Sequence, residues 1–159
     1  MVTRRATGAH RLAGPVEIGW CELVDLPVLG LFDMRAKVDT GARTSSLHAT
    51  RVRQFERDGA AWVRFVAARS VGHASRECEA PLVERRLVTS STGHRQQRYV
   101  IKTRMALGPR AWEAQITLAN RGTMAFPVLI GRRSLRRGFI VNSAKRWLLK
   151  APATGGSAR

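Results

Sequence analysis

Residues 36–42 read Ala-Lys-Val-Asp-Thr-Gly-Ala, a short apolar run that ends in an aspartate, a threonine and a glycine. Gly41 allows the backbone to turn sharply and to approach a ligand closely, and the hydroxyl of Thr40 can hydrogen-bond the backbone or a neighbouring chain. The stretch therefore predicts a strand end at which the carboxylate of Asp39 projects into a site. An ordinary turn at a strand end favours the same residues, so this segment alone leaves both interpretations open.

A second apolar segment, 127–135, reads Pro-Val-Leu-Ile-Gly-Arg-Arg-Ser-Leu. It predicts a buried strand that ends at Gly131 and Arg132, followed by a short helix, because the residues after the glycine lose the strand pattern.

Elsewhere the apolar residues recur mostly at every second position in short runs, which is typical of strands with one buried face. We expect turns at Asp58-Gly59, around Gly93 and at Gly108-Pro109. The sequence thus predicts an all-β domain over 14–150, between a flexible basic tail at 1–13 and a flexible tail at 151–159. The strands are expected at 16–24, 30–38, 47–55, 61–68, 86–91, 98–107, 111–118, 126–130, 139–141 and 146–149.

The chain is strongly basic, with 28 Lys and Arg against 11 Asp and Glu and a net charge of +17. Such a charge attracts polyanions or acidic peptides, but composition does not separate these two kinds of partner. A surface that stacks nucleic-acid bases needs several exposed aromatic side chains on one sheet face. Aromatic residues make up only 6% of the chain, and we therefore do not expect a nucleic-acid partner.

The sequence gives no motif for a cofactor or metal. Cys21 and Cys78 are too far apart for a zinc-ligand pair, the histidines form no His-Glu-x-x-His pattern, and no glycine-rich phosphate-binding loop is present. We expect neither ATP nor zinc. The absence of a secretory signal and of a long apolar run predicts a soluble protein in the reducing cytoplasm, with no membrane partner.

Together, the apolar Asp39-Thr40-Gly41-Ala42 motif and the later apolar Gly131-Arg132 motif resemble those of the retropepsin family of aspartic proteases, whose retroviral members carry both in this order. The stretch from 16 to 149 looks like the bacterial retropepsin-like family historically labelled ATP-dependent zinc proteases and associated with ATP-grasp glutamate ligases. The resemblance implies a closed or partly open β-barrel with one short helix after the Gly-Arg motif, and an aspartic endopeptidase activity.

Aspartic protease chemistry needs two carboxylates that share one proton. Of the four aspartates in the chain, only Asp39 precedes Thr-Gly, so one chain supplies half of a site. The resemblance therefore implies a homodimer in which Asp39 meets its symmetry mate. Thr40 would hydrogen-bond near the floor of that site, and Gly41 and Ala42 would offer backbone groups to a peptide substrate.

Retropepsins also cover their cleft with a hairpin flap, and we expect this flap at 87–100, with the tip near Gly93. The hairpin at Asp58-Gly59 is the competing candidate. Arg43 occupies a position that is often acidic in the retroviral members, and Arg133 replaces their usual Asp or Asn. An ion pair between Arg43 and Arg132 therefore cannot form, and Arg43 is instead a candidate for binding an acidic substrate.

The charge and the glutamate-ligase association favour acidic or glutamate-extended peptides as substrate. An alternative from another class is a noncatalytic basic β-barrel that binds an acidic protein or nucleic acid and keeps the Asp39 motif for structural reasons. A literal zinc protease would require stoichiometric metal, for which the sequence shows no ligand spacing.

Overall fold

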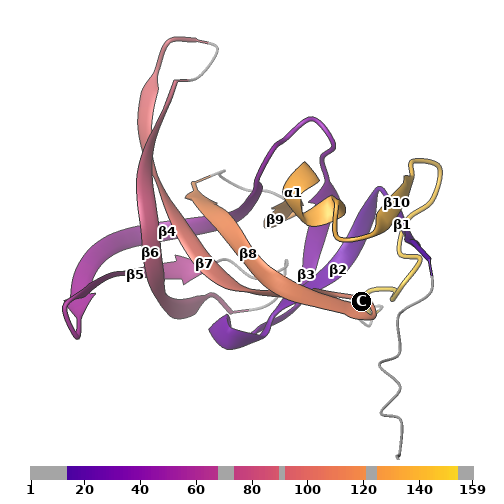
Figure 1. The fold of residues 1–159 in the computed structure, drawn as a ribbon, viewed down its shortest axis with the longest axis horizontal. Coiled ribbons are helices and arrows are strands. Elements are labelled where there is room, and N and C mark those ends of the chain that lie inside the picture. Colours follow the sequence, from indigo (N-terminus) through magenta and orange to yellow (C-terminus); the bar gives the residue numbers. More distant parts are fainter. Residues whose placement is uncertain (1–13, 68–73, 90–91, 121–124, 154–159) are drawn as a thin grey trace, which may run out of the picture.

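The computed structural model describes residues 14–67, 74–89, 92–120 and 125–153. Within these ranges the chain forms strands, one short α-helix and one 3-10 turn, in agreement with the all-β prediction (Figure 1). The elements are β1 (Val16–Gly19), β2 (Cys21–Leu26), η1 (Pro27–Leu29), β3 (Leu31–Val38), β4 (Ser45–Arg57), β5 (Ala60–Ala67), β6 (Arg76–Thr89), β7 (Arg95–Leu107), β8 (Arg110–Ala119), β9 (Val128–Ile130), α1 (Arg132–Leu135) and β10 (Phe139–Asn142).

The main sheet closes only partly on itself. The pairings β2–β3, β3–β9, β9–β4, β4–β8 and β8–β7 run around a ring, and the single pair Asp25–Ala106 joins β7 back to β2. β5 and β6 bridge β4 and β7 outside this ring. The result is the partly open barrel that the sequence predicts, and not a regular closed one.

Strand periodicity explains which side chains fill the ring. On β3, Met34 and Ala36 are buried in the core, whereas Lys37 on the opposite face is exposed, because successive side chains of a strand alternate between its faces. Phe65 on β5 and Ile101 on β7 are fully buried in the same core cluster. Burying each large apolar side chain stabilises the fold by about 1.5–3 kcal/mol.

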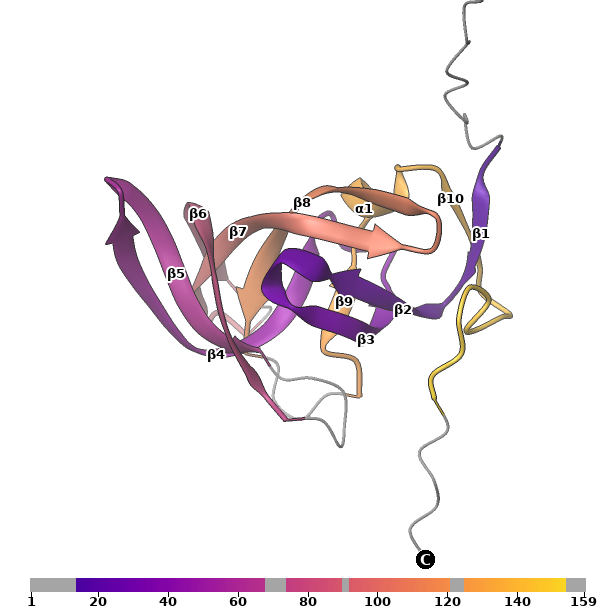
Figure 2. The same ribbon diagram turned by 90° about the horizontal axis from the view of Figure 1, so that it is seen from below.

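Two long hairpins extend from the ring. β4 pairs with β8 only from Ser45 to His48 and then continues with β5 to the turn at Asp58. β6 and β7 pair as far as Thr89 and Arg95. Figures 1 and 2 show the β4–β5 hairpin at the edge of the molecule opposite to β1 and β10.

The predicted strand 16–24 is wrong in one respect, because the structure divides it at Trp20. β1 leaves the main sheet and pairs in parallel with β10, from Val16 opposite Phe139 to Gly19 opposite Asn142. The cause is a close approach of the C-terminal segment. A Cβ on Gly19 would lie 2.5 Å from the carbonyl oxygen of Lys145, so only glycine fits at this crossing.

The predicted strand 146–149 is also wrong, since this segment has no regular pairing. Its backbone is instead held by a carboxylate: Oε1 of the fully buried Glu22 accepts hydrogen bonds from the amides of Gly19 (2.8 Å) and Leu148 (2.9 Å), and Oε2 accepts one from Leu149 (3.3 Å). We call this arrangement the Glu22 clasp. Trp147, in the same segment, has a positive φ of 53°, which is incompatible with a strand.

The remaining differences concern element ends. β6 begins at Arg76, ten positions before the predicted strand, because Arg76–Pro81 pairs with β5 with Cys78 and Ala80 on its buried face. No helix among the described residues has the length and apolar character needed to cross a membrane. The predicted tail at 1–13 and the residues 154–159 lie outside the described part of the chain.

Candidate active site

Asp39 follows β3 directly, at the point where the two sequence motifs meet. β9 lies between β3 and β4, parallel to β3 and antiparallel to β4. The amide of Asp39 donates a hydrogen bond to the carbonyl of Ile130 (3.0 Å), so the aspartate motif and the Gly131-Arg132 motif lie side by side although they are far apart in the sequence.

The carboxylate of Asp39 is fixed by its own turn. Its Oδ1 accepts hydrogen bonds from the amides of Gly41 (2.9 Å) and Ala42 (3.2 Å), while the side chain is half-buried. A Cβ on Gly41 would lie 3.2 Å from this oxygen, so a side chain there would crowd the carboxylate. Within the described part of the chain, the second oxygen Oδ2 makes no hydrogen bond, and the turn therefore orients a carboxylate with one oxygen still available.

Arg132 ties the loop to α1 through backbone carbonyls. Its Nη1 donates to the carbonyls of Thr40 (3.0 Å) and Gly41 (2.9 Å), and its amide donates to the carbonyl of Ala42 (2.8 Å). The amide of Arg133 adds a bond to the carbonyl of Arg43 (3.1 Å). The two motifs are thus held together without an acidic residue at position 43, and the exposed side chains of Thr40 and Arg43 are not used for this.

Ser45 and Ser134 complete the site, and the sequence analysis missed both. Ser45 is 2% and Ser134 4% exposed, and their hydroxyls lie 3.2 Å apart. Ser45 Oγ also accepts a hydrogen bond from the amide of Gly131 (3.0 Å). A Cβ on Gly131 would lie 2.5 Å from the carbonyl carbon of Thr44. The signal for both residues in the sequence is a serine shortly after each motif, at a position where a buried apolar side chain would be expected.

No other aspartate of the chain lies at this loop. The Asp25 carboxylate accepts a hydrogen bond from the amide of Asp33 (2.7 Å), and the Asp33 carboxylate pairs with Lys150 (2.7 Å). These contacts lie at the opposite end of β3. Asp33 precedes Asp39 by six positions along the strand, which corresponds to roughly 20 Å. Asp58 forms the turn of the β4–β5 hairpin. Among the four aspartates of the chain, Asp39 is therefore the one that lies at this loop.

The described residues contain no cluster of three or more His, Cys, Asp and Glu side chains suited to a metal ion. Cys21 and Cys78 are both buried and form no disulfide. Burial raises the pKa of the Cys21 thiol above its usual 9.0, which disfavours the nucleophilic thiolate.

Gly93 lies in the exposed connection between β6 and β7. Its φ is 84°, and no atom of the described residues lies within 4 Å of the position that a Cβ would occupy. In Figure 1 this hairpin end rises on the same side of the molecule as the β3–β4 loop and α1, whereas the turn at Asp58 lies to the left and away from them. The competing flap candidate is therefore the less favourably placed of the two.

Residues 17–152 match a family model named RimB-like and described as the retropepsin-like aspartic endopeptidase RimB. The chain belongs to this family. Among solved structures, a Legionella pneumophila protein of unknown function resembles this RimB-like chain with a TM-score of 0.71 and 26% identity, over 85% of this chain and 98% of the other.

Curated relatives of the RimB-like chain carry a different description. A probable alpha-L-glutamate ligase of Shewanella pealeana is 38% identical over 133 residues, which cover 82% of this chain and 28% of the relative. Another of Desulfotalea psychrophila is 35% identical over 138 residues, covering 86% of this chain and 29% of the relative. The chain thus spans less than a third of the length of these ligases, each of which contains a segment similar to it.

Proposed function

We propose that this protein is an aspartic endopeptidase whose catalytic dyad consists of Asp39 from each of two identical chains. The observation that carries the proposal is the Asp39 carboxylate itself, half-buried at a strand end with Oδ1 bound by two backbone amides and Oδ2 unengaged. Membership of the RimB-like family supports the reaction type. The distance of the other aspartates from this loop supports a dyad built from two copies.

In the proposed reaction, the two Asp39 carboxyl groups share one proton, because two carboxyl groups about 3 Å apart cannot both be ionised. The ionised carboxylate takes a proton from a water molecule, which attacks the carbonyl carbon of the peptide. The protonated carboxyl donates its proton to the carbonyl oxygen, which gives a tetrahedral gem-diol intermediate. In its breakdown, the carboxyl that took the proton from water passes it to the amide nitrogen, a gem-diol hydroxyl returns a proton to the other carboxylate, and the C–N bond breaks to release the amine and the carboxylic acid. Thr40, Gly41 and Ala42 provide the loop that orients the dyad and offers backbone groups to the substrate.

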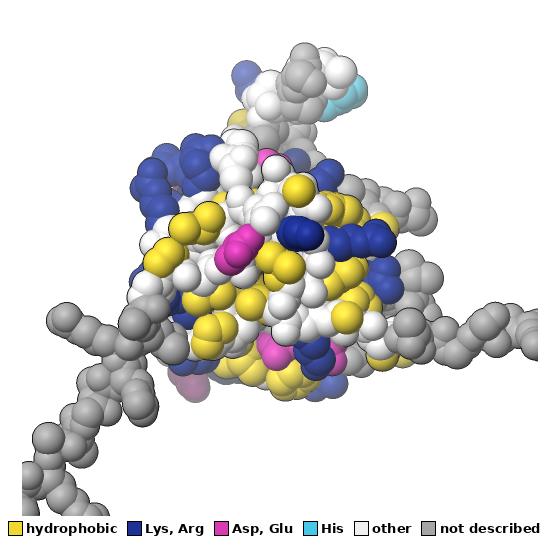
Figure 3. Space-filling view, turned by 90° about the vertical axis from the view of Figure 1, so that its right-hand side faces the viewer, with side chains coloured by type: hydrophobic (Ala, Val, Ile, Leu, Met, Phe, Trp, Pro, Cys, Tyr) yellow, Lys and Arg dark blue, Asp and Glu magenta, His cyan; other side chains and the backbone are white. Residues whose placement is uncertain are grey.

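A second copy has an apolar surface on which to dock. Ile140 on β10 is 55% exposed, and Leu148 in the segment that follows is 41% exposed. Figure 3 shows the face at the right-hand side of Figure 1, where hydrophobic side chains are interspersed with basic and acidic ones. Exposed apolar side chains of this kind favour an interface, and a two-fold axis near α1 would bring the two β3–β4 loops together.

The proposed substrates are acidic or glutamate-rich peptides. The net charge of +17 attracts such chains, and the exposed Arg43 lies next to the catalytic loop. The similarity to part of probable alpha-L-glutamate ligases supports a functional link to an enzyme that adds glutamate. The β6–β7 hairpin with Gly93 at its connection would cover the bound peptide.

The first test compares Asp39→Asn with Asp58→Asn on a glutamate-rich peptide that carries a fluorophore and a quencher. Asp39→Asn should lower the cleavage rate at least about a thousandfold, since it removes the shared-proton chemistry. Asp58→Asn is the matched control, because Asp58 is in a distant hairpin turn and asparagine tolerates its positive φ of 52°. Sedimentation should show the same dimer for both variants.

Undiminished cleavage by Asp39→Asn would refute the assignment. A wild-type chain that is monomeric at every concentration and cleaves no peptide would also refute it, and would instead favour the noncatalytic basic barrel.

A further inference from the structure

The pairing of β4 with β5 contains an irregularity that places an arginine in an unfavourable backbone conformation. Thr50 is opposite Val66 and Arg53 is opposite Arg64, so β4 has one more residue than β5 between these pairs. This extra residue makes a β-bulge. Arg51 within it has a φ of 52°, a region that favours glycine and disfavours a long side chain. Such outliers persist where the surrounding structure enforces them, often at functional sites.

The same bulge places like charges together. Arg53 and Arg64 are directly opposite each other across the two strands, an arrangement that destabilises a sheet. Within the described part of the chain, the exposed side chains of Arg51 and Arg53 form no ion pair and no hydrogen bond. Their positive charge is therefore not compensated inside the molecule.

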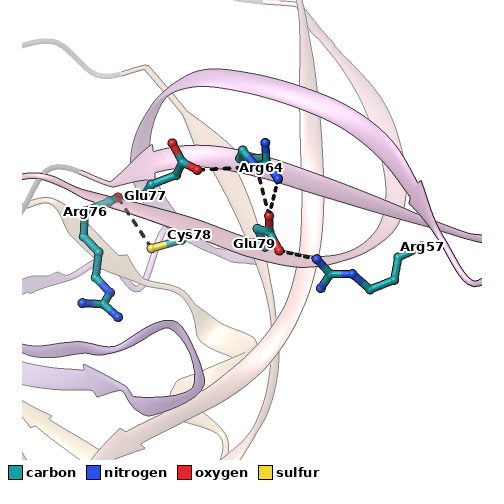
Figure 4. A network of polar contacts seen from close by, with 6 residues as sticks. All are labelled: Arg57, Arg64, Arg76, Glu77, Cys78 and Glu79. Carbon is teal, nitrogen blue, oxygen red and sulfur yellow. Dashed lines mark hydrogen bonds and ion pairs between the residues drawn. The ribbon is translucent and has the colours of Figure 1, made fainter.

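Arg64 is held rigidly beside them. Its Nε and Nη2 donate to Glu79 Oε1 at 2.9 and 2.7 Å, and Glu77 lies 3.5 Å from its Nε. Arg57 also binds Glu79 through its other oxygen (Figure 4). These contacts lower the pKa of the Glu79 carboxyl below its usual 4.5, chiefly through hydrogen bonds from Arg57 and then Arg64. The network fixes one guanidinium next to two uncompensated ones.

Two adjoining hollows open at this bulge. One is lined by Arg51, Arg53, Arg64, Phe65, Val66 and Glu77, and the other by Thr50, Arg51, Val66, Ser75 and Glu77. Beyond His48, where its pairing with β8 ends, β4 pairs among the described residues only with β5. Both hollows thus lie over the paired strands β4, β5 and β6. The edge of β4 that these pairings leave open has backbone groups that can pair with an extended chain.

We infer that this hollow, formed by Arg51, Arg53 and Arg64, is a docking site for carboxylate side chains of an acidic peptide bound in extended form. Arginine recognises carboxylates with paired hydrogen bonds. Arg51 and Arg53 form no ion pair among the described residues, whereas Arg64 is already bound by Glu79 and Glu77 and borders the site. The strand edge of β4 supplies hydrogen bonds to a peptide backbone.

A peptide fits this surface better than a nucleic acid does. The guanidinium of Arg57 lies 4.3 Å from the ring centroid of Trp62 and 5.3 Å from that of Phe55, and Arg64 lies 5.4 Å from Phe55. The aromatic faces that would stack on bases are thus already occupied.

The docking site is separate from the catalytic loop. Arg51 follows Ser45 by six positions on β4, which is roughly 20 Å of strand. An extended peptide would need about six residues to reach from one to the other. The role of this site in holding the acidic flank of a substrate rests on the proposed function, whereas the binding of an acidic peptide to it does not.

The test measures binding by fluorescence anisotropy of a labelled peptide of about twelve glutamates, enough to span both sites, using the full chain with Asp39→Asn so that no cleavage occurs. Arg51→Gln/Arg53→Gln should weaken binding about tenfold, the upper range expected for two exposed ion pairs. The matched control Lys102→Gln/Arg104→Gln removes two charges at the same spacing on β7, where both residues are exposed. It should weaken binding less than about twofold.

Equal weakening of peptide binding by the two double variants would overturn the inference, because the effect would then depend only on net charge. Tighter binding of a single-stranded oligonucleotide of equal charge, lost in the same double variant, would overturn it in favour of nucleic acid. Arg53→Glu gives a second readout: the new pair with Arg64 should leave the Tm unchanged or raised while peptide binding is lost. Retained binding in Arg53→Glu would contradict the site whether or not the protein cleaves peptides.

Discussion

Ser45 contributes one hydroxyl next to the Asp39 loop, and that hydroxyl is buried together with the Gly131 amide from which it accepts a hydrogen bond. The chain at Thr44 passes so close to Gly131 that no side chain fits at Gly131. The amide of Gly131 therefore has no access to water, and Ser45 Oγ accepts its hydrogen bond. Backbone contact and hydroxyl together hold the two motifs in register.

Replacing this serine should destabilise the fold. Ser45→Ala leaves the Gly131 amide buried without a partner, which costs about 1–3 kcal/mol of unfolding free energy. Urea unfolding measures the loss, and Ser143→Ala, at an exposed position, should change stability by less than about 0.5 kcal/mol. Equal effects of the two substitutions would show that the Ser45 bond contributes nothing.

The residues that the sequence could predict at this scale are those whose type alone restricts their role. Asp39, Gly41 and Gly131 stand out because an acid, a sharp turn and a close backbone approach each need a particular residue type. Serine carries no such restriction, so the partner of Ser45 depends on a strand far away in the sequence. The role of Arg132 in joining the motifs could be expected, but its acceptors are backbone carbonyls, which every residue possesses.

Among the elements, β1 and the C-terminal segment show where strand periodicity is insufficient. The apolar residues of 16–24 predict a single strand, yet Gly19 marks a crossing with Lys145 and Arg146 that divides the strand. The Glu22 clasp replaces strand pairing at 148–149 by hydrogen bonds to one carboxylate. A lone glutamate in an apolar strand indicates a buried interaction, but not which segment supplies it.

The clasp can be tested by removing its charge. Glu22→Gln keeps the size of the side chain but turns an amide group toward backbone N–H donors, and it should lower the unfolding free energy by about 1–3 kcal/mol. Trypsin should then cut faster after Lys145 and Arg146 in the folded protein. Glu17→Gln is the control, since exposed Glu17 makes a single bond to Asn142. Unchanged digestion in Glu22→Gln would exclude the clasp as the main restraint.

For the whole molecule, the net charge opposes the proposed dimer. Two copies that each carry +17 repel each other, and salt screens that repulsion over a Debye length of about 10 Å at 0.1 M. The dissociation constant of the Asp39→Asn dimer should therefore fall as the salt concentration rises from about 0.05 to 0.5 M. Sedimentation at several concentrations measures this trend. A dimer that weakens with salt would point to an interface formed by opposite charges.

The hairpins β4–β5, β6–β7 and β7–β8 follow from turn residues in the sequence, but the pairings that arrange the strands into a ring do not. Asp25 and Ala106 form the only β2–β7 pair among the described residues, and no feature of either residue indicates this contact. Likewise, turn residues at 58–59 and near Gly93 predict two hairpins without indicating their directions. The sequence does not indicate that the β6–β7 hairpin rises on the same side of the molecule as the β3–β4 loop (Figure 1).

The parallel pairing of β1 with β10 has a further consequence. Because both strands lie along one border of the molecule, remote from the β4–β5 hairpin (Figure 2), polypeptide attached before β1 would depart from the flank away from this hairpin. The segment after β10 is instead returned to the fold by the Glu22 clasp. A neighbouring domain joined before β1 would therefore leave the β4–β5 hairpin accessible.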